Sequence, residues 1–435
     1  MKKNLLLATS AMVATGFFAT QAAAQIEVTL GGQIEFQAGY AFSEDTSATG
    51  GAGMGGAQAL GGGVINNDPN DANFGNVVSA DDINNGVYNP IGNNLGVAAN
   101  RSGDFTTITD NIAIGISNTA DNGLTYGGQY RVDTGRVRLY VSGAFGRVRM
   151  GQWDTAAHEL RVRVPFAGTD RFGGDAEDYV FNAGIVGDGL NDTGGALISY
   201  TTTGTALDDT GLTLGLSYTP STTAANGIDR TESAGGEYND VGSVAFNYDN
   251  EFSGVGVRFG AGYSFGSAGG TATVGDAGGA NYFVDNNGNN DVYSNRNLSA
   301  WNVGAGLAVA GFDVGAQYID RSESGNISGF NDETWLVGTS YTVGPWVFGV
   351  SYADASQDVS VSGVDAGNAT RAGYSVDEQR FGLGTAYSVA PGLDVKGDLA
   401  YIDSQWSTSG DNAYGENVSI ENDAWVGVVT TALSF

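Results

Sequence analysis

The stretch QIEVTLGGQIEFQAGYAF, residues 25–42, alternates between apolar and polar side chains. Apolar side chains occupy the even positions from Ile26 to Phe42, whereas Glu27, Thr29 and Glu35 occupy odd positions. Because successive side chains of a β-strand point to opposite faces, a strand here has one apolar and one polar face. The stretch is also longer than the ~9–11 residues that a tilted strand needs to cross a bilayer.

The same alternation recurs at residues 212–218, 312–318, 346–352, 393–401 and 425–435. In a soluble β-sandwich the polar face would meet bulk water and carry many Lys and Glu side chains. Here the polar face carries Gly, Ser, Thr, Asp and Arg, and Lys396 is the only lysine after Lys3. The repeated pattern therefore favours strands that turn their apolar face to lipid.

Aromatic side chains occur near both ends of the apolar faces. Trp335 and Tyr341 share a parity six residues apart, as do Phe381 and Tyr387. Six steps of ~3.3 Å, tilted by roughly 40°, cover much of the ~25 Å apolar band of a membrane barrel. The spacing predicts two aromatic girdles, one at each membrane interface.

Composition excludes several classes of function. The chain has no cysteine and a single histidine, His158, so disulfides and thiolate metal sites are impossible and an enzyme is not expected. The net charge of −30 repels nucleic acid, so we expect no nucleic-acid partner. After the first thirty residues, no apolar stretch is long enough for a membrane helix.

The first 24 residues have the pattern of a secretory signal peptide. Lys2 and Lys3 are followed by an apolar run from Leu5 to Ala19, and Ala22–Ala24 form a small-residue cleavage site before Gln25. The alternative, a membrane anchor, is disfavoured because the apolar run is too short. We therefore expect 1–24 to be removed.

About sixteen strand-like segments follow, and their connections alternate in length. Short ones include 144–146, 310–311, 344–345 and 390–392, and long ones lie at roughly 43–104, 154–194, 220–240, 267–296, 355–377 and 407–422. Bacterial barrels place short turns in the periplasm and long loops outside. Residues 25–435 are thus predicted to form an all-β fold, a transmembrane antiparallel β-barrel in the bacterial outer membrane.

Four features carry a resemblance to a known family: the cleavable signal, the opening QIEVTLGGQIEF, the segment GRVRMGQWDTAAHEL at 146–160, and the terminal Phe435. The chain resembles Gram-negative general diffusion porins, and looks most similar to those of Rhodobacter-type alphaproteobacteria. The long, low-complexity loop at about 43–104 departs from the family pattern.

The resemblance implies a water-filled channel for passive diffusion of small hydrophilic solutes and ions. It implies a third loop, about 154–194, that folds into the barrel and narrows the pore. It also implies a homotrimer that contacts membrane lipid and lipopolysaccharide, and a role for Phe435 as a signal to the outer-membrane assembly machinery.

Nine of the fifteen arginines lie between residues 101 and 171. On the strands they share a parity opposite apolar residues such as Val137 and Leu139. An arginine facing lipid near the midplane costs ~2–4 kcal/mol, so these side chains should point into the lumen. The predicted lumen arginines are Arg131, Arg136, Arg138, Arg147 and Arg149.

The predicted inward loop supplies the opposite charge. Its acidic candidates are Asp154, Glu159, Asp170, Asp175, Glu177 and Asp178. We hypothesise that Arg131, Arg138, Arg147 and Arg149 face Asp175, Glu177 and Asp178 across the constriction. Because charged rings select among ions, such an arrangement would set a transverse field there. Alternatively, some of these arginines pair near the barrel ends.

Two further features are a run of oxygen-bearing side chains at 285–291 and the single histidine. Asp285, Asn287, Asn289 and Asp291 place oxygen ligands at alternate positions, but the glycine and terminal glutamate of an EF-hand loop are not in place. A solvated external loop is the favoured interpretation, and we expect no cofactor beyond loosely bound Ca²⁺. His158 is interpreted as a loop residue near the constriction.

The function expected from these patterns is a diffusion channel. The main alternative is a substrate-specific channel for an anion or small polar solute, which the arginines would suit. A barrel enzyme would need a base, and only His158 is available. An adhesin would use the loop at 43–104 but has no need of lumen arginines.

Overall fold

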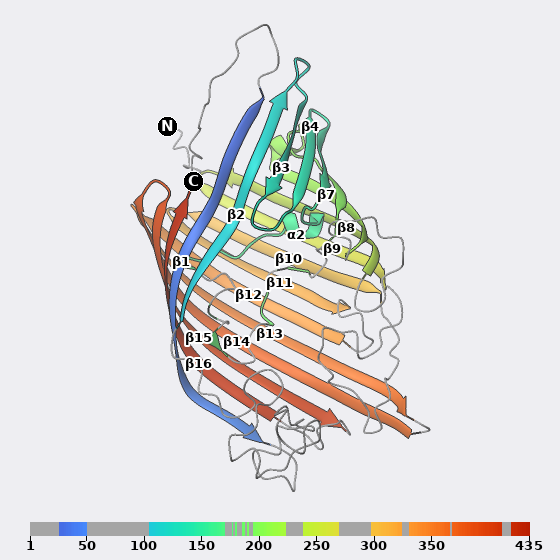
Figure 1. Cartoon of the computed structure of the whole chain (residues 1–435), viewed down its shortest axis with the longest axis vertical. Helices are drawn as coiled ribbons and strands as arrows, with labels where there is room; N and C mark the ends of the chain where they lie inside the picture. The colour runs from blue at the N-terminus through green and yellow to red at the C-terminus, as the bar shows by residue number, and fades with distance from the viewer. Residues whose placement is uncertain are drawn as a thin grey trace, which may run out of the picture.

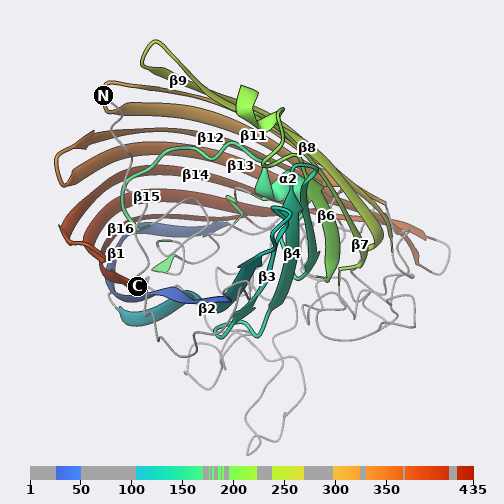
Figure 2. The ribbon, with the colours of Figure 1, turned by 90° about the horizontal axis from the view of Figure 1, so that it is seen from above.

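In the computed structural model, sixteen antiparallel strands among the described residues close into one barrel (Figures 1 and 2). Each strand pairs with its neighbours in sequence, and β1 pairs with β16, so the predicted barrel is confirmed. None of the helices in the described part of the chain is long and apolar enough to cross a membrane. The structure describes residues 26–49, 104–169, 176, 179–180, 185–187, 189–190, 195–222, 238–268, 297–323, 330–365, 368–410 and 419–435.

The elements are, in order, β1 (Glu27–Thr49), β2 (Asp104–Thr119), β3 (Thr125–Arg131), β4 (Val137–Gly143), β5 (Gly146–Gly151), the short helix α2 (Ala156–Glu159), β6 (Leu197–Thr201), the 3₁₀ turn η2 (Asp208–Thr210), β7 (Leu212–Ser221), β8 (Tyr238–Phe252), β9 (Val255–Ala268), β10 (Leu298–Val309), β11 (Phe312–Glu323), β12 (Phe330–Val343), β13 (Trp346–Asp365), β14 (Asn368–Ala390), β15 (Leu393–Gly410) and β16 (Ser419–Ser434).

The predicted alternation sets which face of the wall looks outward. On β1, Phe36 is 51% exposed on the outer face, whereas its neighbours Glu35 and Gln37 are buried on the inner face. Leu214 and Leu216 on β7 repeat this outward exposure. The apolar parity therefore covers the outside of the barrel, and the polar parity lines the inside.

The aromatic residues form two rows on the outer face, as predicted. One row lies beside the short turns and includes the ring pairs Phe312–Tyr341 and Trp346–Tyr387, with centroids 4.3 and 4.5 Å apart. The other lies toward the long connections and includes Tyr318–Trp335 and Tyr401–Trp425, with centroids 4.4 and 5.1 Å apart. The apolar band lies between these rows.

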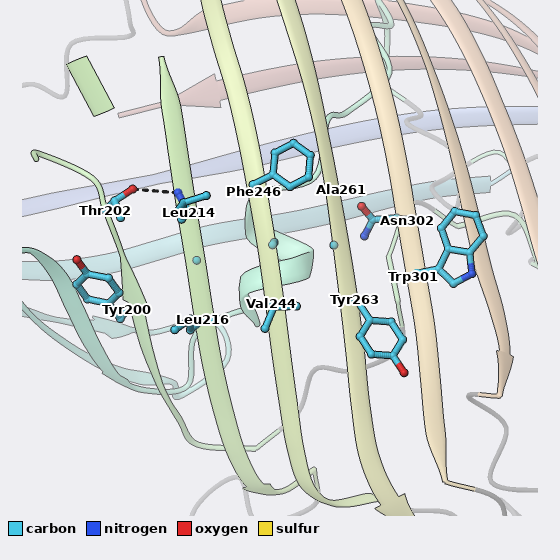
Figure 3. Close-up of a pocket in the computed structure, with 13 residues that line it drawn as sticks. Tyr200, Thr202, Leu214, Leu216, Val244, Phe246, Ala261, Tyr263, Trp301 and Asn302 are labelled. Carbon is cyan, nitrogen blue, oxygen red and sulfur yellow. Dashed lines mark hydrogen bonds between the residues drawn. The ribbon is translucent and has the colours of Figure 1, made fainter. Parts of the chain in front are cut away.

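An apolar groove of about 610 Å³ also lies on the outer face, across β6–β10. Leu216, Val244 and Tyr263 project along it from three neighbouring strands (Figure 3). These side chains are exposed and belong to the outward parity, so the groove faces lipid and not the lumen.

The ends of several strands differ from expectation. β1 continues to Thr49, beyond the loop start expected near 43, and a β-hairpin pairing Asp365 with Asn368 replaces the loop expected at 355–377. The loop expected at 407–422 is shorter, because β15 and β16 extend into it. Beyond the apolar band both faces of a strand meet water, so the ladder continues without the alternation that reveals it in the sequence.

The chain end completes the barrel seam. The backbone N–H of Phe435 donates to Gly32 O, and the N–H of Gly32 donates to Phe435 O, both at 3.1 Å. This exchange extends the β1–β16 ladder that begins at Gln33 and Ser434. No backbone edge is left open there, as a lipid-facing barrel requires.

The wall is uneven in height. Strands β3–β6, which we term the low wall, have seven, seven, six and five residues, whereas β13 and β14 have 20 and 23. Seven residues at ~3.3 Å each, tilted by roughly 40°, rise only ~18 Å, which is less than the ~25 Å apolar band. One side of the barrel is thus too short to span the bilayer core by itself.

Candidate functional site

Residues 155–169 run inside the barrel along its inner wall (Figure 2). The segment starts at α2, where the N–H groups of Ala156 and Ala157 donate to the hydroxyls of Ser217 on β7 and Ser243 on β8, at 3.0 and 2.8 Å. It ends at Thr169, whose hydroxyl bonds Thr430 of β16 at 2.9 Å. In its described part, the third loop therefore folds inward as predicted.

Glycines on the wall strands let this segment lie flat against the sheet. A Cβ atom at Gly338 of β12 would lie 2.4 Å from Pro165 O, and one at Gly349 of β13 would lie 2.5 Å from Ala167 N. Gly262 of β9 and Gly304 of β10 also lie too close to the segment to accommodate a Cβ atom. We call these four residues the glycine seam. It keeps the segment close to the wall, so that the loop takes up less of the pore.

The second half of the loop packs on apolar residues of the inner face. Tyr179 and Val180 join a buried cluster with Ile402 of β15 and Val426 of β16. Val186 and Leu190 are buried in a second cluster, whose wall residues include Leu298, Ile319 and Leu336. Apolar residues replace polar ones on the inner face here, because the loop covers this part of the wall.

The arginines of β3–β5, and Arg136 just before β4, lie beside side chains that face outward. Tyr130, Val132, Val137 and Leu139 beside them are exposed on the outer face, whereas Arg131 and Arg149 are buried and Arg136, Arg138 and Arg147 are partly buried. Together they form a basic strip on the inner side of the low wall.

Each of three arginines has an identified partner. Arg131 binds Asp133 at 2.5 Å, and this hydrogen bond holds the pKa of the Asp133 carboxyl below its ordinary value. Arg138 Nε donates to the backbone carbonyl of Gln152 at 2.8 Å. Arg149 forms an ion pair with Glu159 of α2.

Trp153 lies against two of these arginines. The guanidinium carbons of Arg138 and Arg149 lie 4.8 and 4.7 Å from its ring centroid, within cation–π range. Its indole N–H reaches the carbonyls of Leu139 and Met150, both at 3.2 Å, which fixes the ring to β4 and β5. Sequence reasoning missed this role, although Trp153 follows the arginine parity of 147 and 149.

The structure describes only two of the six predicted loop acids, Asp154 and Glu159. Glu159 meets Arg149, and Asp154 attracts Arg138 electrostatically. Asp170, Asp175, Glu177 and Asp178 lie outside the described residues, so the proposed opposition across the constriction remains a prediction.

The calcium candidates and the signal peptide also fall outside the described residues. Within those residues, no group of three or more Asp, Glu or His side chains could hold a metal ion. The described part of the lumen therefore offers arginines, paired carboxylates and an aromatic ring, in a polar passage bounded by an inward loop.

A family model described as Gram-negative porin matches residues 8–405. The chain belongs to the Gram-negative porin family. It spans the outer membrane as a β-barrel and is an outer-membrane diffusion channel.

Several solved structures are similar to this porin. A Rhodobacter capsulatus porin refined at 1.8 Å is 14% identical with a TM-score of 0.47, and the match covers 94% of this chain and 100% of that one. OmpT of Vibrio cholerae, described as a trimer form, is 12% identical with a TM-score of 0.49, covering 94% and 99%. A mutant of Rh. blastica porin is 16% identical with a TM-score of 0.43, covering 94% and 100%. No curated protein matches the sequence.

The glycine seam leads to a stability prediction. Gly338→Val should lower the free energy of unfolding by about 1–3 kcal/mol, because the new side chain overlaps Pro165. Gly427→Val is the matched control, since no atom lies within 4 Å of a Cβ built there. Equilibrium denaturation in phospholipid vesicles measures both, and equal effects would contradict the seam's role.

Proposed function

We propose that the lumen passes small hydrophilic solutes and ions by passive diffusion, and that the basic strip of the low wall biases which ions pass. The observation that carries this proposal is the pair of guanidinium groups of Arg138 and Arg149, stacked on Trp153 where the inward loop begins. Passage through such a lumen requires no covalent chemistry.

The arrangement supports selection by fixed charge. Arginine stays protonated at any physiological pH, and stacking on an aromatic ring limits its rotation. The guanidinium groups are thus held in position before an ion arrives, instead of adjusting to it. Charged side chains lining a pore are a recognised source of ion selectivity, and held groups exert a steadier field than mobile ones.

A substrate-specific channel for an anion is the second candidate, and the same arginines favour it. A planar guanidinium presents donors that match carboxylate and phosphate oxygens. A specific channel would show current block by one anion at low concentration, whereas a general channel would not. Bilayer recordings with added organic anions separate the two candidates.

We also propose that this porin is a homotrimer with the low wall at its centre. Irregular backbone outside helices and paired strands is not tolerated in contact with the hydrocarbon core, so a wall whose strands are too short to cross it must be covered by protein. Tyr130, Val137, Leu139 and Ile198 present an exposed apolar surface on these strands. Cyclic symmetry places the same surface of each copy around one axis. The resemblance to porins indicates that the oligomer has three subunits.

Neutralising the stacked arginines should change ion selectivity. In Arg138→Gln/Arg149→Gln the reversal potential under a KCl gradient should shift toward cations, because two fixed positive charges leave the lumen. Arg258→Gln is the control: this arginine pairs with Asp313 on β9 and β11, away from the low wall, and should cause a smaller shift. An unchanged potential in the double variant would mean that these arginines do not face the ion path.

Charging the low wall should dissociate the oligomer. Leu139→Asp places a carboxylate on the outer face of β4, and we expect monomers by mass photometry in detergent. Leu383→Asp makes the same change on β14, where Leu383 is also exposed, and should leave trimers intact. Trimers that persist in Leu139→Asp would argue against this interface.

A further inference from the structure

Arg321 connects the wall and the loop through one buried side chain. It lies on the inner face of β11, is 3% exposed, and binds Asp332 Oδ1 through Nε and Nη2 at 3.0 and 2.7 Å. Nη2 also donates to the Thr334 hydroxyl at 2.9 Å. These partners, both on β12, hold the guanidinium in one orientation.

The Arg321 guanidinium also reaches the loop. Nη2 donates to the backbone carbonyl of Ile185 at 3.1 Å, and Nη1 donates to those of Gly187 and Gly189 at 3.3 and 3.1 Å. Three alternate residues therefore turn their carbonyls toward the same side chain. We call residues 185–187 and 189–190 the returning limb.

The other contacts of the returning limb in its described part are one side-chain hydrogen bond and apolar packing. The N–H of Ile185 donates to Glu378 Oε2 at 3.0 Å, and Val186 and Leu190 pack in the cluster around Ile319. The limb has no helix or strand there. Its carbonyls need donors from elsewhere, because unpaired buried backbone groups are costly.

Only arginine fits this role. Its five N–H groups form a fixed planar fork that makes six contacts, to a carboxylate, a hydroxyl and three carbonyls, because the two Nη2 hydrogens are shared among three acceptors. Lysine has three donors on a flexible stem and cannot hold the same set in place.

We propose that Arg321 is a positioning residue that sets the open cross-section of the pore by clamping the returning limb to the wall. The proposal rests on the channel function proposed above. With the clamp removed, the limb moves in the water path, and the ionic current through one channel alternates between several levels.

The test replaces the whole ion pair. Arg321→Met alone leaves the buried Asp332 charge uncompensated, which destabilises the barrel whatever the limb does. Arg321→Met/Asp332→Leu removes both charges, together with the clamp. Single-channel recording in planar bilayers should then show a several-fold rise in open-channel current variance and frequent sublevels, against a steady wild-type level.

The matched control is Arg258→Met/Asp313→Leu. This pair is also an inner-face ion pair involving β11, and its ionic contact is with the wall and not with the returning limb. It should keep a steady current. A merely structural role for Arg321 would lower the thermal unfolding temperature of the double variant without increasing current variance.

Steady wild-type-like current in Arg321→Met/Asp332→Leu would overturn the proposal. If that variant does not fold, Arg321→Lys is the second test, since it keeps the charge but not the fork, and unchanged variance there would also overturn it. Absence of current in the wild type would instead reject the proposed channel function, so the two failures are distinguishable.

Discussion

The structure depends on one constraint: every backbone hydrogen-bonding group in the lipid bilayer must find its partner within the protein. Lipid offers no partner to an open strand edge, so the sheet must close on itself. Pairing of β1 with β16, extended to Gly32 and Phe435, provides that closure. Once the sheet is closed, its two faces meet different solvents, and the alternation along each strand sends apolar side chains outward and charged ones inward. The basic strip is thus a consequence of barrel closure, and we propose that it also selects among ions.

The inward loop has to satisfy the same requirement with little secondary structure of its own. Its first half receives wall partners from Ser217, Ser243 and Thr430, and lies close to the sheet because the seam glycines lack side chains. Its returning limb receives donors from Arg321 instead. Where the loop covers the wall, buried apolar residues replace polar ones. The free cross-section of the pore therefore depends on contacts that span long distances in sequence.

The parts of the fold that follow from local periodicity could be predicted. Phe36 and Glu35 show which face is apolar, and Trp335 and Tyr341 mark both interfaces. The parts that depend on contacts between distant segments could not. In the sequence, Gly338 is only a small residue on a strand. In the structure a glycine is needed there, because Pro165 of the loop passes directly over it. Ile319, Leu336 and Ile402 break the alternation and were the available signal that something covers the inner wall. The inward direction of the arginines was predictable from parity, but the stacking of Arg138 and Arg149 on Trp153 required the register of β4 against β5.

Liposome swelling tests the central claim, an open water-filled pore narrowed by an inward loop, most directly. Vesicles containing the purified protein are placed in uncharged sugars of increasing size, and the swelling rate is followed by light scattering. The account predicts rates that fall steeply with solute size and rise in proportion to the concentration gradient, without saturation. Absence of swelling, or a rate that saturates for one sugar at low concentration, would contradict it.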